Sequence, residues 1–380
     1  MLEKIRLTHY RGFEDTGDIH IAPVTLLLGK NNSGKSSLLK ALSLIHDGLA
    51  YGNKSRLSLR SETGVISGSS LADLFHRRQF TDLGFYLDFT RLKYEIHLIG
   101  NNGKVIPSAY RIAGTDIHPE KTAQGAGIHK EMAGLYPTTH EADIPGLAGL
   151  VSFNLLHIGP LRIAAPAIIA GNEASARDFV GYSGEHTYSI LLDSYLSDGT
   201  LLQSVSEWFA DNLGISIGFE PIDAQGTNFR PYAERDGMRI SIADSGLGIA
   251  QVLPVITQTF IHGENTIICI EQPALHLHPD AHAAVSRRIA HSAKKTGMRY
   301  IIESHSKNFL LGLRLLAVTP EELFANTDAA IYYIESSEIP SIVKPIKIET
   351  DGSLSYWPTG VFGEDTELLD KILDSYDLQD

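Results

Sequence analysis

The sequence predicts an α/β fold: a mainly parallel sheet flanked by helices, with an N-terminal antiparallel β subdomain and a mixed α+β insertion. Three observations favour it. The glycine-rich loop "GKNNSGKSS" lies between a hydrophobic strand and a helix. Strands and helices alternate after residue 236, which implies right-handed crossovers between parallel strands. Residues 3–28 contain two strands joined by a turn and begin with alternating charged and apolar side chains.

The expected elements follow from periodicity and from glycine and proline breaks. A helix over 36–49 follows the loop, and short alternating strands occupy 84–89 and 92–99. Residues 114–149 are rich in Gly, His and Pro and show little periodicity, whereas 186–213 show helical periodicity. The regular part consists of strands at 238–243, 266–271 and 298–304 and helices at 248–261, 279–295 and 307–318.

This pattern predicts a discontinuous head. We expect residues 1–50 and 236–335 to form the head, residues 51–235 to form the insertion, and residues 336–380 to form a C-terminal β segment with an acidic helical tail. The 380 residues are enough for one large domain or two ordinary ones.

Composition indicates the cellular location of the protein. The residues are 43% hydrophobic and 20% charged, and no apolar run has the length of a membrane span. The N-terminus has the pattern of a strand and not of a cleavable signal. Cys269 is the single cysteine, which excludes an intramolecular disulfide and a cysteine metal cluster. We therefore expect a cytoplasmic protein with no membrane partner.

The net charge argues against a nucleic-acid surface. The chain has 45 acidic and 32 basic residues, a formal charge of −13. Two local basic clusters occur, at 76–79 and 286–295. The second lies near the end of an expected helix, where cations complement the helix dipole. Nucleic acid is therefore not indicated as a partner by charge.

The loop beginning at Gly29 matches the phosphate-binding pattern G-x-x-x-x-G-K-[ST] through Gly34, Lys35 and Ser36. Its backbone N–H groups and the helix start surround phosphate oxygens, the lysine reaches the β and γ phosphates, and the serine offers an oxygen to Mg²⁺. A glycine turn that only caps a helix is a poor alternative, because both the motif and its context match. The expected ligands are ATP and Mg²⁺, and the remaining loop residues expected to contact nucleotide are Asn31, Asn32, Ser33 and Ser37.

A second motif, "ADSGLGIAQVLPV" at 243–255, contains Ser245, Gly246 and Gly248. Taken alone, it is better explained as a helix N-cap and turn than as a binding motif. It is followed by "TIICIEQPALHLHP", an apolar strand that ends in Glu271. The order of strand, glycine turn, helix and acid-terminated strand is that of ABC-type ATPases.

These motifs together resemble the RecF-like and overcoming-lysogenization-defect (OLD) group of ABC-type ATPases (AAA15 and AAA21 types), which includes many bacterial defence ATPases. "YRGFEDTGDIHIAPVTLLLGKNNSGKSSLLKAL" resembles the N-terminal strands and Walker A motif, "DSGLGIAQVLP" the signature, "ICIEQPALHLHP" Walker B, and "YIIESHSKNFLLGLR" the last strand with the switch histidine, His305. "DGSLSYWPTGVF" resembles the tail of one subgroup, and the insertion matches only weakly, through "HIGPLR". The implied fold is a P-loop NTPase of the ABC-ATPase type.

The resemblance implies a homodimer, or a higher homo-oligomer, with ATP between two heads. Walker A of one head and Ser245, Gly246 and Gly248 of the other would hold the nucleotide. Glu271 would hold Mg²⁺ with Ser36.

Further roles are implied for three more residues. His305 would contact the γ-phosphate or the attacking water. Arg11 is expected near the nucleotide, with an ordinary surface arginine as an equal alternative. Gln79 is a weak candidate for a Mg²⁺-sensing loop glutamine.

Residue 272 departs from the expected pattern. The family's usual catalytic glutamate is replaced by Gln272, which cannot accept a proton from water, and Ala274 stands where another acid is expected. Loss of a general base costs roughly 10²–10⁴-fold in rate, so the sequence predicts slow hydrolysis unless Glu271 or His305 assists. A natural slow timer, a lost activity and an introduced substitution remain open explanations.

His276, His278 and His282 follow this acid, and a zinc site is the alternative to a polar loop near the dimer interface. Cysteine ligands are missing, so the polar loop is preferred. A nuclease activity is not expected, because only 75 residues follow His305 and no Asp-x-Asp pair occurs.

The leading functional hypothesis is an ATPase that acts as a nucleotide-driven dimer switch for a separate effector protein, in anti-phage defence. One alternative is a RecF-like DNA clamp. Another is a scaffold that binds ATP without useful hydrolysis.

Overall fold

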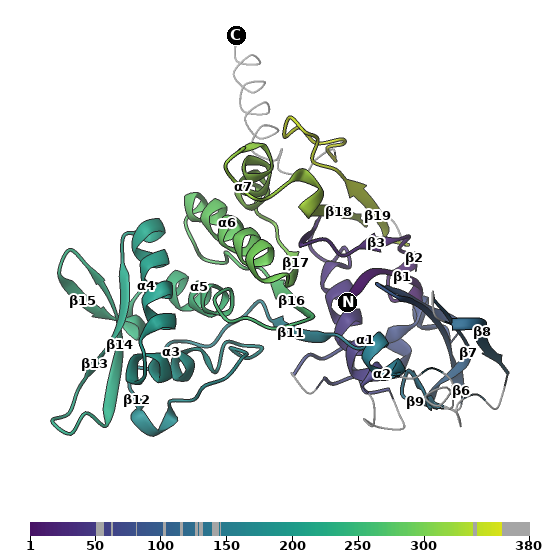
Figure 1. The fold of residues 1–380 in the computed structure, drawn as a ribbon, viewed down its shortest axis with the longest axis horizontal. Coiled ribbons are helices and arrows are strands. Elements are labelled where there is room, and N and C mark those ends of the chain that lie inside the picture. The colour runs from purple at the N-terminus through teal and green to yellow at the C-terminus, as the bar shows by residue number, and fades with distance from the viewer. Residues whose placement is uncertain are drawn as a thin grey trace, which may run out of the picture.

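The structure is a computed structural model, and it describes residues 1–50, 57–61, 64–80, 82–101, 104–114, 117–125, 128, 132–138, 144, 146–336 and 340–358. The parallel sheet lies at the centre, with the sheet that contains the N-terminal strand on one side and a smaller lobe on the other (Figure 1). The expected C-terminal acidic helix, within 359–380, lies outside the described residues.

The central sheet has the strand order β11-β16-β17-β4-β18-β19. Its strands are β4 (Val24–Gly29), β11 (Asn154–Ile158), β16 (Thr266–Glu271), β17 (Arg299–Glu303), β18 (Ala329–Glu335) and β19 (Ile342–Ile346). All neighbours pair in parallel except β18 and β19. Every residue of β4 and β16 is buried, as expected for parallel strands covered on both faces. The prediction of a mainly parallel α/β sheet is confirmed.

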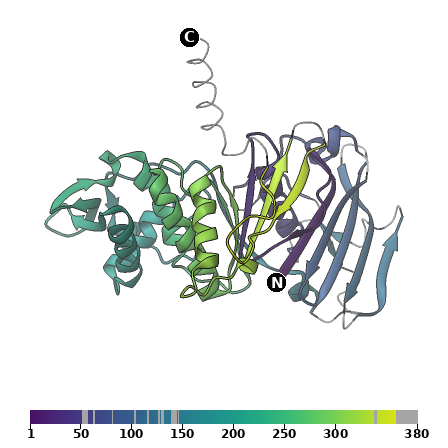
Figure 2. The same ribbon diagram turned by 90° about the horizontal axis from the view of Figure 1, so that it is seen from above.

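Helices cover both faces of this sheet. They are α1 (Lys35–Leu49) on one face and α6 (Pro279–Thr296) and α7 (Lys307–Val318) on the other. Leu26, Ile268 and Ile302 share a core with α6 and α7, whereas Leu27 and Ile267 share a core with α1 and the antiparallel sheet. Alternate residues of one strand therefore serve two separate cores, and α1 lies between the two sheets (Figure 2).

The antiparallel sheet begins with the N-terminal strands and continues into the expected insertion. Its order is β2-β1-β5-β6-β7-β8, with β3 paired to β1. The strands are β1 (Leu2–Tyr10), β2 (Phe13–Asp15), β3 (Ile19–His20), β5 (Leu83–Phe89), β6 (Leu92–Asn101), β7 (Lys104–Gly114) and β8 (Ile117–Gln124). The sequence showed little periodicity beyond residue 114, and it did not predict β8.

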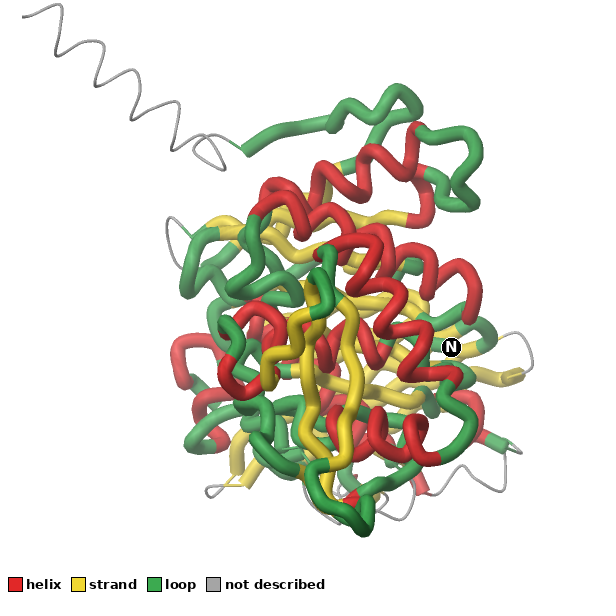
Figure 3. The backbone as a smooth tube through the Cα atoms, turned by 90° about the vertical axis from the view of Figure 1, so that its left-hand side faces the viewer, coloured by secondary structure: helices red, strands yellow, loops and turns green. Residues whose placement is uncertain are grey.

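A separate lobe lies beyond β11. It contains β12 (Ile169–Ala170), β13 (Ser216–Pro221), β14 (Asn228–Arg235), β15 (Met238–Ser241), α3 (Thr187–Leu196), α4 (Thr200–Leu213) and α5 (Leu247–Gln258). Figure 3 looks onto this lobe, with its strands in yellow and its helices in red. The strand expected at 238–243 forms as β15, but it pairs antiparallel with β14 and does not join the parallel sheet.

The remaining elements are short. They are β9 (Met132–Ala133), β10 (Tyr136–Pro137), α2 (Leu147–Val151), and the 3-10 turns η1 (Leu71–Leu74), η2 (His76–Arg78), η5 (Gly171–Glu173), η6 (Ile242–Asp244) and η7 (Asn326–Asp328). Within the described part of the chain, no helix has both the length and the apolar character that a membrane crossing requires.

Sheet membership does not follow the expected division of the chain. Residues 51–235 were expected to form one insertion. They supply strands to the antiparallel sheet, β11 to the parallel sheet, and β12, β13 and β14 to the sheet of the smaller lobe. β19, from the expected C-terminal segment 336–380, forms the edge of the parallel sheet. Strand pairing between segments that are distant in sequence decides this assignment, and local periodicity does not report it.

Arg299 connects the two large sheets. Its Nη1 donates to the carbonyl oxygens of Leu2 (2.9 Å) and Ile21 (2.8 Å), so the first residue of β17 is tied to the N-terminal strands. Charged hydrogen bonds of this kind contribute about 1.5–3 kcal/mol.

We therefore expect Arg299→Ala to lower the free energy of unfolding by roughly 1.5–3 kcal/mol, measured by urea denaturation. Arg177→Ala is the matched control, because Arg177 is exposed. Within the described chain, its side chain donates one hydrogen bond, to the hydroxyl of the nearby Ser175 at 3.3 Å. An equal effect of the two substitutions would contradict the assigned role of Arg299.

Candidate functional site

The phosphate-binding loop joins β4 to α1. Gly29 has φ 149° and Gly34 has φ 110°, backbone conformations that side chains rarely adopt. A Cβ on Gly29 would lie 2.5 Å from the carbonyl oxygen of Ile334, and one on Gly34 would lie 2.6 Å from Cζ of Phe13. Both glycines are therefore required by backbone conformation and by packing.

The loop encloses the amine of Lys35. Lys35 is buried, and its Nζ donates to the carbonyl oxygens of Gly29 (2.9 Å) and Lys30 (2.7 Å). Burial lowers the pKa of this amine, and the negative charge of Glu303 opposes the shift. Ser33 Oγ is buried and has no hydrogen-bond partner among the described residues. These polar groups surround a position that suits phosphate oxygens.

The other predicted loop residues lie around this position. Asn31 and Asn32 are exposed, and Asn32 has φ 63°. Ser37 lies beside Arg11, whose Nη1 donates to Ser37 Oγ at 3.3 Å. The structure thus brings Arg11, from the N-terminal strand region, to the first turn of α1.

A cavity of about 480 Å³ opens at this point. It is lined by Arg11, Gly12, Ser37, Gly68, Asp73, Phe75, Arg77 and Arg78. Gln79, the weak Mg²⁺-sensing candidate, is exposed at the end of η2 and is not among these lining residues. Two further arginines that were not predicted as ligands, Arg77 and Arg78, therefore lie beside the loop.

Two strand-end carboxylates lie at the edge of the parallel sheet where the loop begins. Glu271 ends β16, Glu303 ends β17, and the two residues are paired in register. Ser36 Oγ donates to Glu303 Oε2 at 2.7 Å. Burial raises the pKa of Glu303; the Ser36 hydrogen bond lowers it and the Glu271 charge raises it further. Glu303 was not predicted as a site residue, although "YIIE" ends in an acid as "TIICIE" does.

Glu271 is buried and has its own partners. His157 Nε2 is 3.0 Å from Glu271 Oε1, and His157 Nδ1 is 3.3 Å from Ser43 Oγ of α1. The ring of Tyr182 packs edge-on against His157. Burial raises the pKa of Tyr182 to about 12, with the Glu271 charge as a further cause. The carboxylate is thus held from the side of β11 and α1.

Arg162 connects β16 to the helix of the signature segment (residues 243–255). Its guanidinium donates to the carbonyl oxygens of Glu271 (2.7 Å) and Gln272 (3.1 Å). Gln251 of α5 accepts from the Arg162 backbone N–H (3.1 Å) and donates to its carbonyl (2.8 Å). Burial lowers the pKa of Arg162 to about 10, and Glu271 opposes this shift. The backbone of Gln272, at φ 50°, is further held by its N–H bond to the Glu303 carbonyl at 2.8 Å.

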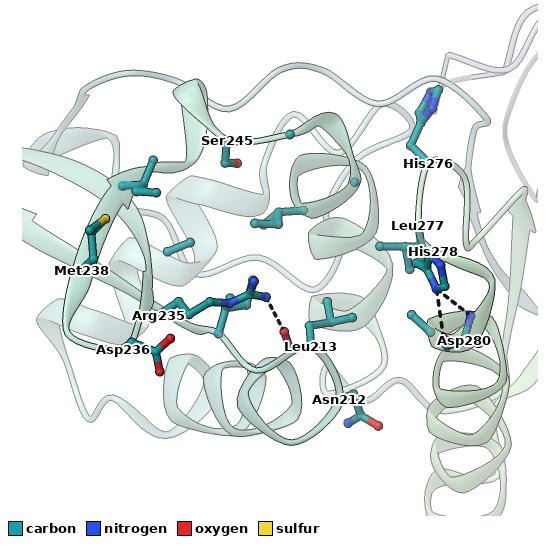
Figure 4. A pocket seen from close by; sticks show the side chains of 17 residues that line it. Asn212, Leu213, Arg235, Asp236, Met238, Ser245, His276, Leu277, His278 and Asp280 are labelled. Atoms are coloured by element: carbon teal, nitrogen blue, oxygen red, sulfur yellow. Dashed lines mark hydrogen bonds and ion pairs between the residues drawn. The ribbon is translucent and has the colours of Figure 1, made fainter.

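The signature segment lines a different cavity. Ser245 Oγ donates to the Ile242 carbonyl (2.8 Å), Gly246 is the N-cap of α5, and a Cβ on Gly248 would lie 2.8 Å from the His276 carbonyl. The cavity holds about 780 Å³, and α4, β14, β15 and the starts of α5 and α6 surround it (Figure 4). None of its lining residues comes from the phosphate-binding loop. Within one chain, the predicted nucleotide residues therefore form two separate sets.

His305 follows β17 and is exposed. Partial desolvation and the positive charge of Lys35 lower the pKa of its imidazole. The neutral ring is therefore favoured at neutral pH, with a nitrogen lone pair available to a water molecule or ligand.

Two of the three histidines of the zinc alternative, His278 and His282, are engaged with different partners. Both ring nitrogens of His282 have partners, Ser306 Oγ at 2.6 Å and the Leu277 carbonyl at 3.2 Å. His278 caps α6 and lies 3.1 Å from Asp280. Among the described residues, no group of three or more His, Cys, Asp or Glu side chains is arranged as a metal site. The contacts give the zinc alternative no support.

Comparisons with known proteins identify families that this chain resembles. The family model described as "AAA ATPase domain" matches residues 1–95 and 189–310, more than half of the chain, and a model for a protein of unknown function (DUF3696) matches residues 325–372. No curated protein matches the sequence.

Two solved structures share the fold. One is an Smc head bound to the C-winged helix domain of ScpA, with 14% identity, a TM-score of 0.52, and 91% of this chain and 98% of that chain covered. The other is an Smc head domain with an extended coiled coil bound to the C-terminal domain of ScpA derived from Pyrococcus furiosus, with 12% identity, a TM-score of 0.51, and 98% and 99% covered. These similarities and the parallel sheet show the P-loop fold of the ABC-ATPase type. With the family model matching more than half of its residues, the chain belongs to the AAA ATPase domain family.

Proposed function

We propose that the chain binds Mg-ATP in the loop of residues 29–37 and uses it as a slow, nucleotide-driven dimer switch. The observation that carries this proposal is the loop itself. A buried lysine amine is held by two carbonyl oxygens, and a helix start and a serine hydroxyl that has no partner among the described residues lie beside it. A triphosphate would replace the carbonyl contacts of Lys35 with stronger charged ones.

Residues around the loop are available to bind the rest of the nucleotide and its Mg²⁺. The cavity lined by Arg11 and Arg77 extends from Ser37, and it would take the part of the nucleotide beyond the phosphates. Oxygen ligands suit Mg²⁺, and Ser36 and Glu271, with the adjacent Glu303, offer hydroxyl and carboxylate oxygens. When bound, Mg²⁺ neutralises charge on the β and γ phosphates.

The second half of the site is proposed to come from another copy of the chain. Ser245, Gly246 and Gly248 line a cavity without any residue of the phosphate-binding loop. Leu247, in the same turn, is 60% exposed. A homodimer or higher homo-oligomer that sets this turn against the ATP of a second copy would complete the site, because N–H groups at a helix start bind phosphate.

Hydrolysis is proposed to be slow because residue 272 carries an amide. Water attacks the γ-phosphorus, the bond to the β–γ bridging oxygen breaks, and the proton of water needs an acceptor. Gln272 cannot be that acceptor, while neutral His305 offers a lone pair near Lys35.

The resemblance to the RecF-like and OLD group extends the proposal to the ATPase component of an anti-phage defence system with a separate effector. A nuclease or toxin encoded by a neighbouring gene would support this role, and a set of repair genes would favour the DNA clamp. Gln272 favours the alternative of a scaffold that binds ATP without useful hydrolysis, and the charge of −13 disfavours the DNA clamp.

Lys35→Ala is expected to weaken ATP binding by roughly 10- to 100-fold, because it removes charged hydrogen bonds worth about 1.5–3 kcal/mol, and to abolish turnover. The measurements are titration with a fluorescent ATP analogue and phosphate release. Lys93→Ala is the control, since Lys93 lies exposed on β6. Unchanged binding and turnover in Lys35→Ala would overturn the proposed function.

Gln272→Glu is expected to raise phosphate release by about 10²-fold and to shorten the lifetime of an ATP-dependent dimer, because it restores a proton acceptor. Turnover and size-exclusion chromatography with ATP measure the two effects, and exposed Gln225→Glu is the control. A rate equal to that of the parent chain would show that residue 272 does not limit hydrolysis.

A further inference from the structure

Helix α7, which lies beside α6 (Figure 1), is apolar on its outer side as well as on the side that faces the sheet. Phe309 and Leu313 are buried in the core that α7 shares with α6. On the outer side, Leu311 is 40% exposed, Leu315 is 52% exposed and Val318 is 39% exposed. These three residues form one stripe at helical spacing, the α7 stripe. A helix that is apolar all round is normally covered on every side, and the described residues leave this side partly uncovered.

The α7 stripe continues into a hollow at the C-terminal end of the helix. The hollow has a volume of about 420 Å³, and Val318 and residues of the loop after α7 line it. One of these loop residues, Leu323, is 84% exposed. Thr350 also lines the hollow, so a segment close to the C-terminus forms part of its wall. The outer side of α7 therefore offers an apolar groove.

The chain returns to α7 before it leaves the described residues. Arg314 Nε, on α7, donates to the Gly352 carbonyl at 2.7 Å. A Cβ on Gly352 would lie 2.8 Å from Val318 Cγ1, so this turn packs against the end of the stripe. The described part ends at Pro358, which lies within roughly 22 Å of Gly352 because an extended residue spans at most about 3.6 Å. The tail, residues 359–380, therefore starts near the groove.

The sequence of the tail has the pattern of a helix with one apolar side. The charged residues between the apolar ones would fall on the opposite side of such a helix. The tail contains seven acidic residues and one lysine. A helix of this length is marginal alone in water and gains most of its stability from packing its apolar side. The apolar positions are Leu368, Leu369, Ile372, Leu373 and Tyr376.

We propose that the tail covers the α7 stripe of its own chain, with Leu369, Ile372 and Tyr376 against it. Two apolar sides at helical spacing are then removed from water together. The charges are complementary, because the tail is acidic, whereas α7 carries Lys307 and Arg314 and no acid. The short connection to Gly352 gives the tail a high effective concentration at the groove.

The contact would reach a helix that starts beside the candidate nucleotide site. α7 begins shortly after His305, and Ser306 caps it by accepting from the Phe309 N–H at 3.0 Å. A tail that covers α7 would help to hold the position of the helix that follows His305. The contact itself requires no nucleotide and is independent of the proposed function.

Cross-linking in the full chain tests the contact. Cys269 is buried, so introduced surface cysteines are the ones that react with a short bifunctional maleimide. Leu315→Cys is combined with Ile372→Cys, on the apolar side of the tail, or with Lys371→Cys, the matched control on its charged side. We expect the intramolecular cross-link to form several-fold faster with Ile372→Cys, measured on non-reducing gels and by peptide mapping.

Hydrogen exchange of α7 in the full chain provides a measurement that does not depend on the register of the contact. Ile372→Asp should speed exchange of the amides of residues 307–318 by roughly 10-fold, the factor that corresponds to the burial of about one aliphatic side chain. Lys371→Asp is the control, because it places the same side chain at the neighbouring position on the charged side. It should leave the exchange rates of α7 at the values of the parent chain.

The inference requires both differences. Equal cross-linking from positions 371 and 372 would overturn it, and so would equal exchange of α7 in the parent chain and in Ile372→Asp. Cross-linked dimers in place of the intramolecular product would assign the α7 stripe to the tail of a second copy and would reject the contact within one chain. Faster cross-linking at position 372 together with faster exchange in Ile372→Asp alone would support it.

Discussion

The edge of the parallel sheet where β4, β16 and β17 end is the constraint on which the rest of the site depends. Parallel strands bring their carboxyl ends to one edge, and residues over 240 positions apart in sequence meet there. The hydrogen bond from Ser36 to Glu303 joins the helix after β4 to the end of β17. Both glycines of the loop are packed tightly, so this helix start has little freedom to move.

A second layer of contacts supports this edge. Arg162 donates to the carbonyl groups of the last residue of β16 and of the residue after it, and Gln251 holds the backbone of Arg162. These contacts make a continuous polar path from α5 to the strand end that carries Glu271. Because its members are buried, leaving any one without its partner would be costly. The helix that begins at the signature segment is therefore mechanically tied to the carboxylate site.

Local sequence patterns were sufficient to predict those elements whose chemistry or burial depends on residues close together in the chain. The motif at 29–36 identified the loop, and the apolar runs before Glu271 and Glu303 identified β16 and β17 almost to the residue. Helix α7 matches its expected range of 307–318. In contrast, β8 and β11 were not identified as strands of their sheets, because pairing with distant strands determines their positions.

The sequence by itself determined the α/β class, the phosphate-binding loop and the amide at position 272, since each is written in a short run of residues. Only the tertiary structure decided that Glu303 contacts Ser36, that Arg162 holds the backbone carbonyl of Gln272, and that β15 pairs with β14 and does not join the parallel sheet. The physical reason is strand order. Insertion of β17 between β4 and β16 sets which carboxylate lies next to the loop, and no local pattern encodes that order.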